Sequence, residues 1–418
     1  MATKTSISVF AQLVKYLPRR IVEDVAAKYP QKARGFSYSE QLYLLMLGHM
    51  LHAFSLNEIV DISTVHEAEL WRSCHVSSAA LNTFSHANRT RDPKVAEEVY
   101  WSLAGMLGSD QPALYGGRNP GRLFKFRNHR ILAIDSSVIQ LSLNCVDWAR
   151  YIHGKAAVKL HMRTDIANMM PNMVIIGDRA SEYDTVKAPA LCADMKRGDI
   201  LVADRGYQNY RFFDELDKRG VNFVIRERCS FKFKALESRT DLPKDVESDE
   251  TVGFKVHLTR KKYTGVLRRV SAIVEVDGVK RRMVFLTNNT TWSARTIADI
   301  YKGRWQIELL FKELKQTLQL HSFYGTNSNA VRWQIWAALI VHLLMRYLKC
   351  LTRWNSSYSR LIGIVRAAVW MHYDILDFLR FYGIAPPQGS REKLANAPYL
   401  PGFEKYFIRA MGQQKAQN

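Results

Sequence analysis

The chain has 418 residues, enough for two or three domains of ~150 residues each, and 47% of its residues are apolar, so it can bury a sizeable core. Its 22 glycines and 12 prolines are too few for a fibrous or disordered chain. Sixty Lys and Arg against 39 Asp and Glu give a net charge of +21, which disfavours a neutral or basic partner and favours a polyphosphate, most often nucleic acid.

The sequence gives little support to a membrane partner. The longest apolar stretch, Trp333 to Met345, is interrupted by Gln334 and His342 and is much shorter than the ~20 apolar residues that a membrane span needs. We therefore expect a buried core helix there. Residues 1–17 contain no apolar region typical of an export signal. The five cysteines are scattered and never spaced C-x-x-C, which argues against disulfides or a thiolate zinc site and favours a reducing cytoplasm. We expect a protein of the bacterial-type cytoplasm, associated with the nucleoid.

Residues 1–107 are predicted to form a helical N-terminal DNA-binding domain. Helix-start signals occur at Ser37 with Glu40, at Ser55 with Glu58 and at Asp92 before a proline. A short helix is expected over residues 77–88, followed by Arg89 and Arg91. Short helices with basic ends are typical of a helix-turn-helix-like DNA reader. The alternative is a helical bundle that merely dimerises or packs, because helix caps are not specific to DNA binding.

The rest of the chain is predicted to form an α/β fold, a mixed sheet flanked by helices. A basic linker over 108–129 precedes a catalytic core in two parts, 130–229 and 293–385, separated by a β-rich insertion over 230–292 and followed by a tail over 386–418. The predicted core elements are strands Ile131–Leu141, Val158–Asp165 and Met173–Ile176, helix Asp184–Met195, strand Ile200–Ala203, helix Tyr210–Arg219 and strand Val221–Ile225. In the insertion, strands Val252–Leu258, Val266–Val276 and Arg282–Thr287 are expected, with a hairpin turn at Asp277-Gly278.

Two aspartates lie in unusual sequence contexts. Asp135 follows the apolar residues 131–134, and Asp204 ends the short buried strand 200–203. A carboxylate in an apolar run is costly unless it is paired, hydrogen-bonded or bound to a metal. One such residue would more often be structural, but two on neighbouring strands indicate a site.

A third acidic residue comes from a predicted helix, Ile297–Leu320. On it, Tyr301, Arg304, Glu308 and Lys315 fall within an arc of roughly 60° that borders the apolar stripe, so Glu308 is expected to face the two aspartates. Glu313 points roughly 140° away from Glu308. We expect Glu313 to be solvated or paired with a basic neighbour, contributing ~0–1 kcal/mol.

These residues resemble the DDE transposases of the insertion-sequence-four (IS-four) family. The matching motifs are Asp135 in Ile-Asp-Ser-Ser, Lys159-Leu160-His161, Asp204-Arg205-Gly206-Tyr207 and the Y-x2-R-x3-E-x6-K signature of Tyr301, Arg304, Glu308 and Lys315. The resemblance covers most of the chain, including the helical N-terminal region and the insertion. It implies an RNase H-like fold and cut-and-paste DNA transposition.

The chemistry of these residues agrees with that reaction. Hydrolysis and strand transfer at phosphodiesters need an activated water or 3′-hydroxyl and a stabilised leaving oxygen, which two divalent ions can provide. Three carboxylates without a Cys or His cluster suit Mg²⁺ or Mn²⁺ better than Zn²⁺. The resemblance implies that Asp135 bridges both ions while Asp204 and Glu308 hold one each. It also implies that Tyr301, Arg304 and Lys315 hold the terminal phosphate and the DNA backbone, and Arg205 is a further phosphate-binding candidate.

Other features are less specific. His161 is more often a core histidine than a catalyst. The basic runs 260–262, 268–269 and 280–282 could follow DNA phosphates or be solvated hairpin edges. Trp292, Trp305 and Trp333 could stack on an extruded base or belong to the core.

The expected function is therefore Mg²⁺-dependent transposition of double-stranded DNA, by a homodimer that pairs the two terminal inverted repeats and joins them to target DNA. A non-catalytic DNA-binding protein or repressor derived from a transposase is one alternative. A plain RNase H-like nuclease that cuts without joining is the other.

Overall fold

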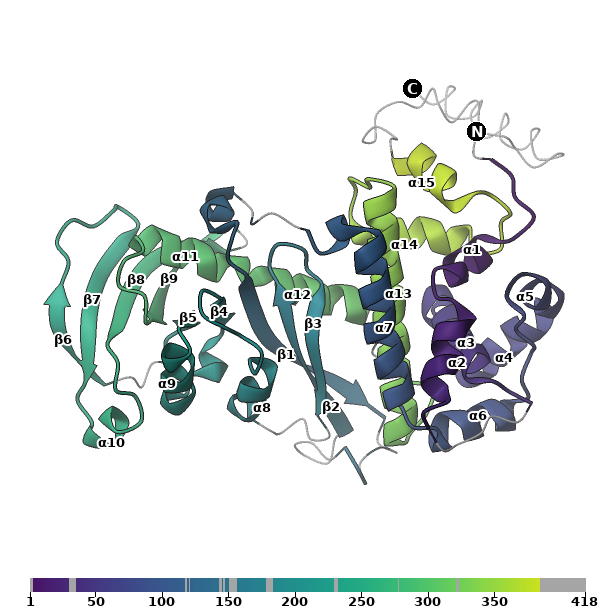
Figure 1. Ribbon diagram of the computed structural model, residues 1–418, viewed down its shortest axis with the longest axis horizontal. Helices are drawn as coiled ribbons and strands as arrows, with labels where there is room; N and C mark the ends of the chain where they lie inside the picture. The colour runs from purple at the N-terminus through teal and green to yellow at the C-terminus, as the bar shows by residue number, and fades with distance from the viewer. Residues whose placement is uncertain are drawn as a thin grey trace, which may run out of the picture.

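A computed structural model of the chain describes residues 3–29, 35–116, 119, 121–142, 145, 147–149, 156–177, 183–228, 232–276, 278–320 and 323–383. A long twisted sheet occupies one side of the molecule and a body of helices occupies the other (Figure 1). The expected tail over 386–418 lies outside the described residues, as do Asp277 of the predicted hairpin turn and part of the expected linker.

Nine strands of the described residues form one mixed sheet in the order β3-β2-β1-β4-β5-β9-β8-β7-β6. Strands β1, β4 and β5 are parallel, β2 and β3 extend the sheet antiparallel on one side, and β9 to β6 extend it antiparallel on the other. The strands are β1 (Ile131–Leu141), β2 (Ala156–Asp165), β3 (Pro171–Gly177), β4 (Ile200–Ala203), β5 (Asn222–Arg226), β6 (Phe233–Ser238), β7 (Val246–Phe254), β8 (Leu267–Val276) and β9 (Val279–Thr287).

The expected mixed sheet is confirmed, and β1 and β4 have the predicted bounds. The β-rich segment 230–292 continues the same sheet, because β9 pairs with β5 at Val224–Thr287. The predicted strand Val252–Leu258 is wrong at both ends, because β7 begins at Val246 and ends at Phe254. The chain leaves β7 at Phe254 and turns into the short helix α10 (His257–Arg260), where Arg260 Nε donates a hydrogen bond to the Phe254 carbonyl.

Helices cover both faces of the sheet, and side chains of β1 alternate between them. Leu132 and Ile134 pack into the core beneath α8 (Asp184–Leu191) and α9 (Tyr210–Lys218). Ile131 and Ala133 belong to the core on the other face, which α11 (Ala294–Gly303) and α12 (Trp305–Lys312) cover (Figure 1). The alternation therefore places residue 135 on the α11–α12 face and residue 136 on the α8 face.

The helical body combines the two ends of the described chain. Its longest helix, α13 (Ser328–Leu351), is the predicted core helix and packs against α3 (Tyr38–Leu51), α6 (Leu81–Thr90) and α7 (Lys94–Asp110). Among the described residues it is the one helix long and apolar enough to cross a membrane, but 83% of its most apolar 18 residues are buried inside the protein. Residues near the N-terminus also bond to the segment before α15, as when Gln12 Nε2 donates to the Tyr373 carbonyl at 2.7 Å. A fragment limited to residues 1–107 would therefore lack part of its own core. The helices are α1 (Val9–Lys15), α2 (Arg19–Ala26), α3 (Tyr38–Leu51), α4 (Leu56–Val65), α5 (Glu67–Cys74), α6 (Leu81–Thr90), α7 (Lys94–Asp110), α13 (Ser328–Leu351), α14 (Tyr358–Ala367) and α15 (Ile375–Gly383).

The predicted helix starts of this body are confirmed at two positions. Ser37 and Glu40 form a reciprocal capping box at α3, and the Ser55 side chain accepts a hydrogen bond from the Glu58 amide at α4. At the third position the helix begins slightly later than predicted, because Pro93 is the N-cap of α7.

Arg91, which we expected among the basic residues of a DNA-reading surface, is instead part of the core. Its side chain is buried, donates hydrogen bonds to the Phe36 and Ser37 carbonyls and to Gln41 Oε1, and lies 4.3 Å from the Tyr38 ring centroid. These partners could not be predicted from the sequence, because they come from a loop and a helix at least 50 residues away along the chain. Arg89, by contrast, is exposed.

Candidate active site

Asp135 and Asp204 are brought together by the pairing of β1 with β4. The two strands are parallel, with Ile134 beside Ala203, so Asp135 and Asp204 follow matched positions. Asp135 lies inside β1, and Asp204 comes directly after β4 and precedes the 3-10 helix η5 (Arg205–Tyr207). The two aspartates that the sequence singles out therefore lie side by side on adjacent parallel strands.

The prediction of one continuous helix over Ile297–Leu320 is wrong, because the segment is broken into three parts. The chain forms α11, turns at Arg304, forms α12 and ends in a π-helix, η6 (Glu313–Thr317). Two i→i−3 hydrogen bonds flank the turn, from the Arg304 amide to Tyr301 and from the Ile307 amide to Arg304. Close packing accompanies this break, because a Cβ on Gly303 would lie 2.6 Å from Ile166 Cδ1.

Arg304 joins two of the three predicted carboxylates. Its Nη1 donates a hydrogen bond to Asp135 Oδ2 at 2.8 Å, and its Nη2 donates to Glu308 Oε1 at 2.5 Å. Although burial acts in the opposite direction, contacts with Tyr301, Asp135 and Glu308 raise the pKa of Arg304. The predicted orientation of Glu308 toward Asp135 agrees with this geometry, despite the break in the helix.

Tyr301 connects the same group to Asp204. Its hydroxyl lies 3.3 Å from Asp204 Oδ1, and the Arg304 guanidinium lies 5.4 Å from its ring centroid. Burial raises the pKa of Tyr301, so the phenol remains a hydrogen-bond donor at neutral pH. The two aspartates, Glu308, Tyr301 and Arg304 thus form one connected cluster.

Lys315 and Arg205 occupy different environments. Lys315 Nζ donates to the Val138 carbonyl of β1 at 2.7 Å, and burial lowers the pKa of its ammonium group. Arg205 is exposed immediately after Asp204. Lys315 therefore ties η6 to the strand that carries Asp135, whereas Arg205 is open to solvent.

Glu313 is paired with basic neighbours, one of the two environments that we expected, and is not solvated. Its Oε2 lies 2.5 Å from Arg346 Nη2 and 3.1 Å from His342 Nε2, both on α13. Although burial acts in the opposite direction, these hydrogen bonds lower the pKa of Glu313. The small energy expected for an exposed pair does not apply, because the His342 side chain is fully buried and that of Arg346 is 8% exposed.

Asp184, which was predicted only as the start of a helix, is a fourth carboxylate near the site. It accepts a hydrogen bond from Ser136 Oγ at 2.6 Å and pairs with Lys159 Nζ at 2.8 Å. His161 Nδ1 lies 3.7 Å away, and a Cβ on Gly206 would lie 3.2 Å from Asp184 Oδ2. Asp184 therefore braces the α8 side of β1, directly behind Asp135. The sequence did offer a sign of this role. Asp184 is an acidic residue in the first turn of α8, and it follows Lys159 and His161 of the Lys159-Leu160-His161 motif on β2.

Several other candidates are structural. Trp333 is buried and donates its ring N–H to the Arg91 carbonyl, and His161 is buried as expected. The basic run 268–269 is not available to bind DNA phosphates. Arg268 forms a bidentate ion pair with Asp249, and Arg269 pairs with Glu227 and Glu250. Residues 260–262 and 280–282 are exposed, Trp305 is 37% exposed and Trp292 is half-buried.

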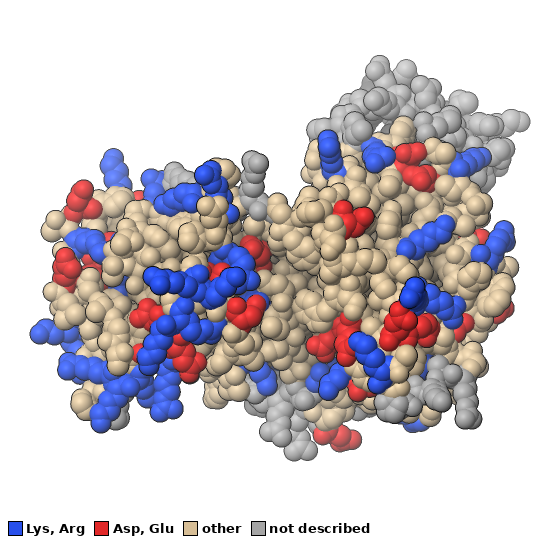
Figure 2. Space-filling model, in the orientation of Figure 1, with Lys and Arg blue, Asp and Glu red and all other residues tan. Residues whose placement is uncertain are grey.

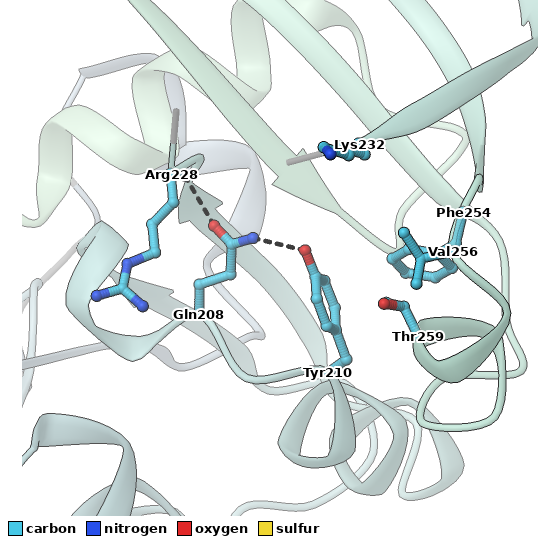
Figure 3. A pocket seen from close by; sticks show the side chains of 7 residues that line it. All are labelled: Gln208, Tyr210, Arg228, Lys232, Phe254, Val256 and Thr259. Atoms are coloured by element: carbon cyan, nitrogen blue, oxygen red, sulfur yellow. Dashed lines mark hydrogen bonds between the residues drawn. The ribbon is translucent and has the colours of Figure 1, made fainter. Parts of the chain in front are cut away.

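A cavity of about 230 Å³ lies beyond the loop that follows Asp204. Figure 3 shows Gln208 between Arg228 and Tyr210, with Phe254, Val256 and Thr259 on the other side. The Gln208 side chain accepts a hydrogen bond from the Arg228 amide and donates one to the Tyr210 hydroxyl, both at 2.8 Å. This framework links the Asp204 loop to the end of β5.

The donor set fits a hard divalent cation. Oxygens of Asp135 and Glu308 already converge on a single positive group, the Arg304 guanidinium, and Asp204 lies one tyrosine hydroxyl away. Among the described residues, no three Asp, Glu, His or Cys side chains are close enough to hold a metal as they stand. Metal binding would therefore require these side chains to rearrange.

The chain is similar to known families and proteins over much of its length. The profile of the Transposase DDE domain matches residues 127–344, more than half of the chain, and residues 5–71 match a domain of unknown function, DUF4372. Transposase y4zB of Sinorhizobium fredii is 31% identical over 71% of this chain and 80% of its own length. The transposase of element IS5377 of Geobacillus stearothermophilus is 29% identical over 54% of this chain and 58% of its own length. A solved piggyBac transposase synaptic complex with hairpin DNA covers 96% of this chain and 89% of its own, at 10% identity and a TM-score of 0.44.

The chain therefore belongs to the DDE transposase family. It is a DNA transposase of an insertion sequence, an enzyme that cleaves DNA and transfers strands, and its chemistry depends on a divalent metal.

Proposed function

We propose that the protein excises its element at terminal inverted repeats and joins it to target DNA, using two Mg²⁺ ions held by Asp135, Asp204 and Glu308. The convergence of Asp135 and Glu308 on one cation carries this proposal. Bound there, the ions would activate the attacking hydroxyl and stabilise the leaving oxygen; Mn²⁺ could replace Mg²⁺. The charges of both Glu308 and Asp204 act on Asp135, which supports a position for Asp135 between the other two carboxylates, where it would bridge the ions.

The chain's own basic groups would position the DNA. Tyr301 and Arg304 contact the carboxylates, Lys315 is bound to the carbonyl of Val138 on the strand that carries Asp135, and Arg205 is exposed beside Asp204. A guanidinium can hold a phosphate through two parallel hydrogen bonds, which suits Arg304 and Arg205. Lys315 would have to leave the Val138 carbonyl to contact phosphate.

We further propose that α6 reads the terminal repeat. Its outward face carries short polar and basic side chains that can bond to base edges, and its apolar side is buried through Phe84 and Ala87. The exposed residues are Asn82, Thr83, Ser85, His86 and Arg89. This is the helix that was predicted over 77–88, now without the contribution of Arg91.

The sheet side of the molecule supplies a basic surface for the remaining DNA. Figure 2 shows Lys and Arg side chains gathered where α9 and α10 lie. The exposed cations on α9 and at the end of α10 are Arg211, Lys218, Arg260, Lys261 and Lys262, and the loops before β4 and before β6 add Lys196, Arg197, Arg228 and Lys232. Phosphate contacts of this kind give affinity without sequence preference.

The strand order β3-β2-β1-β4-β5, with both aspartates on the central pair, supports an RNase H-like core, and the Tyr301-to-Lys315 signature supports the IS-four family. An element has two ends, so we propose a homodimer that pairs them, acting in the cytoplasm on the nucleoid.

One assay separates this proposal from its alternatives. We expect the full chain to cut an end-labelled duplex carrying the terminal repeat when Mg²⁺ is present, and to join the released end to a target plasmid. A non-catalytic binder or repressor would shift the duplex on a gel without cutting it. A plain nuclease would cut repeat and scrambled duplexes alike and yield no joined product. In EDTA, the transposase should bind the repeat and leave it intact.

A further inference from the structure

Arg304 occupies an unusual position for a residue proposed to hold DNA. Its side chain is 12% exposed, and its two Nη atoms are both committed to carboxylates, Asp135 and Glu308. Its Nε is buried and has no hydrogen-bond partner among the described residues. The guanidinium is therefore enclosed in the acidic cluster and faces away from solvent.

The carboxylates need a positive group at this position. Asp135 and Glu308 share one guanidinium, and Asp204 lies close enough to add to the negative charge around Asp135. Like charges at short range in a partly buried site repel one another strongly. Arg304 is the described cation that forms ion pairs with both Asp135 and Glu308, and it offsets this repulsion.

We propose that Arg304 is a built-in counter-ion of the catalytic cluster, which competes with the divalent cation for Asp135 and Glu308 and must withdraw before the metal binds. This inference rests on the proposed assignment of the metal to these carboxylates.

The competition follows from the atoms involved. A Mg²⁺ ion needs carboxylate oxygens at about 2.1 Å in a nearly octahedral arrangement. Asp135 Oδ2 and Glu308 Oε1 are the oxygens that Arg304 occupies, and a guanidinium between them would be repelled by a divalent ion. Once withdrawn, the Arg304 fork has two donors directed at no protein acceptor, which is the arrangement that suits a DNA phosphate.

The test compares Mn²⁺ binding to the full-length protein without DNA, measured by calorimetry. We expect Arg304→Gln to bind Mn²⁺ about 5- to 150-fold more tightly than the wild type, the range of ordinary coupling energies. In EDTA the same variant should melt at a lower temperature, and Mn²⁺ should raise its melting temperature more than it raises that of the wild type. Arg304→Lys keeps the charge but not the fork, so its gain in affinity should be smaller.

A matched control is available elsewhere in the sheet. Arg269 also lies between two carboxylates, Glu227 and Glu250, and its side chain is 16% exposed. Arg269→Gln should lower the melting temperature and leave Mn²⁺ affinity unchanged. A purely structural Arg304 would behave in the same way.

Unchanged or weaker Mn²⁺ binding by a folded Arg304→Gln or Arg304→Lys protein would overturn the inference. Failure of the proposed metal site would look different, because Asp135→Asn would then leave Mn²⁺ affinity at the wild-type value. If Asp135→Asn removes binding and the Arg304 variants do not strengthen it, the metal site stands and the counter-ion role is wrong.

Discussion

Replacing Asp135 or Asp204 with asparagine should reduce cleavage of the element's ends by about a thousandfold or more, while binding to those ends stays nearly intact. Each substitution removes one negative ligand of the proposed metal site, and metal stabilisation of the reacting oxygens is worth several kcal/mol. Neither substitution touches α6 or the exposed cations over α9 and α10. Cleavage and band-shift assays on the same labelled duplex measure both effects, and wild-type cleavage by either variant would contradict the site.

The stability of Asp135→Asn distinguishes a functional aspartate from a structural one. Burial, helped by Glu308 and Asp204 and opposed by Arg304, raises the pKa of Asp135 to about 6. A carboxyl group with a raised pKa stabilises the fold fully below its unfolded pKa of ~3.9, and that contribution is lost as the pH rises through about 6. At pH 7.5 the ionised carboxylate therefore opposes folding. We expect Asp135→Asn in EDTA to melt at a temperature no lower than that of the wild type.

Glu308→Gln and Glu313→Gln should have opposite consequences, although the two residues are only five positions apart. Glu308→Gln should abolish Mg²⁺-dependent cleavage with little loss of stability, because its side chain is 33% exposed and Arg304 is its ion-pair partner among the described residues. Glu313→Gln should lose about 3 kcal/mol of stability, because Arg346 and His342 would remain buried without their carboxylate. Each folded Glu313→Gln molecule should keep most of its cleavage.

Denaturant unfolding and cleavage at a temperature where both variants are folded test this pair. The converse pattern, a stable but inactive Glu313→Gln and an active Glu308→Gln, would mean that α12 is rotated relative to the sheet. It would also remove Glu308 from the catalytic cluster.

Features that depend on residues close together in the sequence could be predicted. Strand β1 begins with an apolar run that Asp135 follows, and β4 is a short apolar run directly before Asp204, so the bounds of both strands and the positions of the two aspartates could be predicted. Arg304 and Glu308 are four residues apart, so their side chains stay in contact even though the helix breaks at Arg304. Local periodicity was therefore enough to place Glu308 on the side of Asp135.

Features that depend on distant packing could not be predicted. The break at Arg304 accompanies a close contact between Gly303 and Ile166, and η6 is held by α13 through Glu313 and Arg346. The extension of the sheet through β9 depends on a pairing with β5 that no local pattern shows. Arg91 and Arg268 look like surface cations in the sequence, and only their tertiary partners make them core residues.

Iron-directed cleavage of the protein tests most directly whether Asp135, Asp204 and Glu308 hold the metal. Fe²⁺ can substitute for Mg²⁺ at carboxylate sites, and with ascorbate and peroxide it generates radicals that cut the polypeptide close to the bound ion. Mass spectrometry of the fragments should place the cuts in β1 near Asp135, beside Asp204 and in α12 near Glu308. Excess Mg²⁺ and the Asp135→Asn substitution should each suppress these cuts. Cuts elsewhere in the chain, or the same cuts persisting in Asp135→Asn, would contradict the claim.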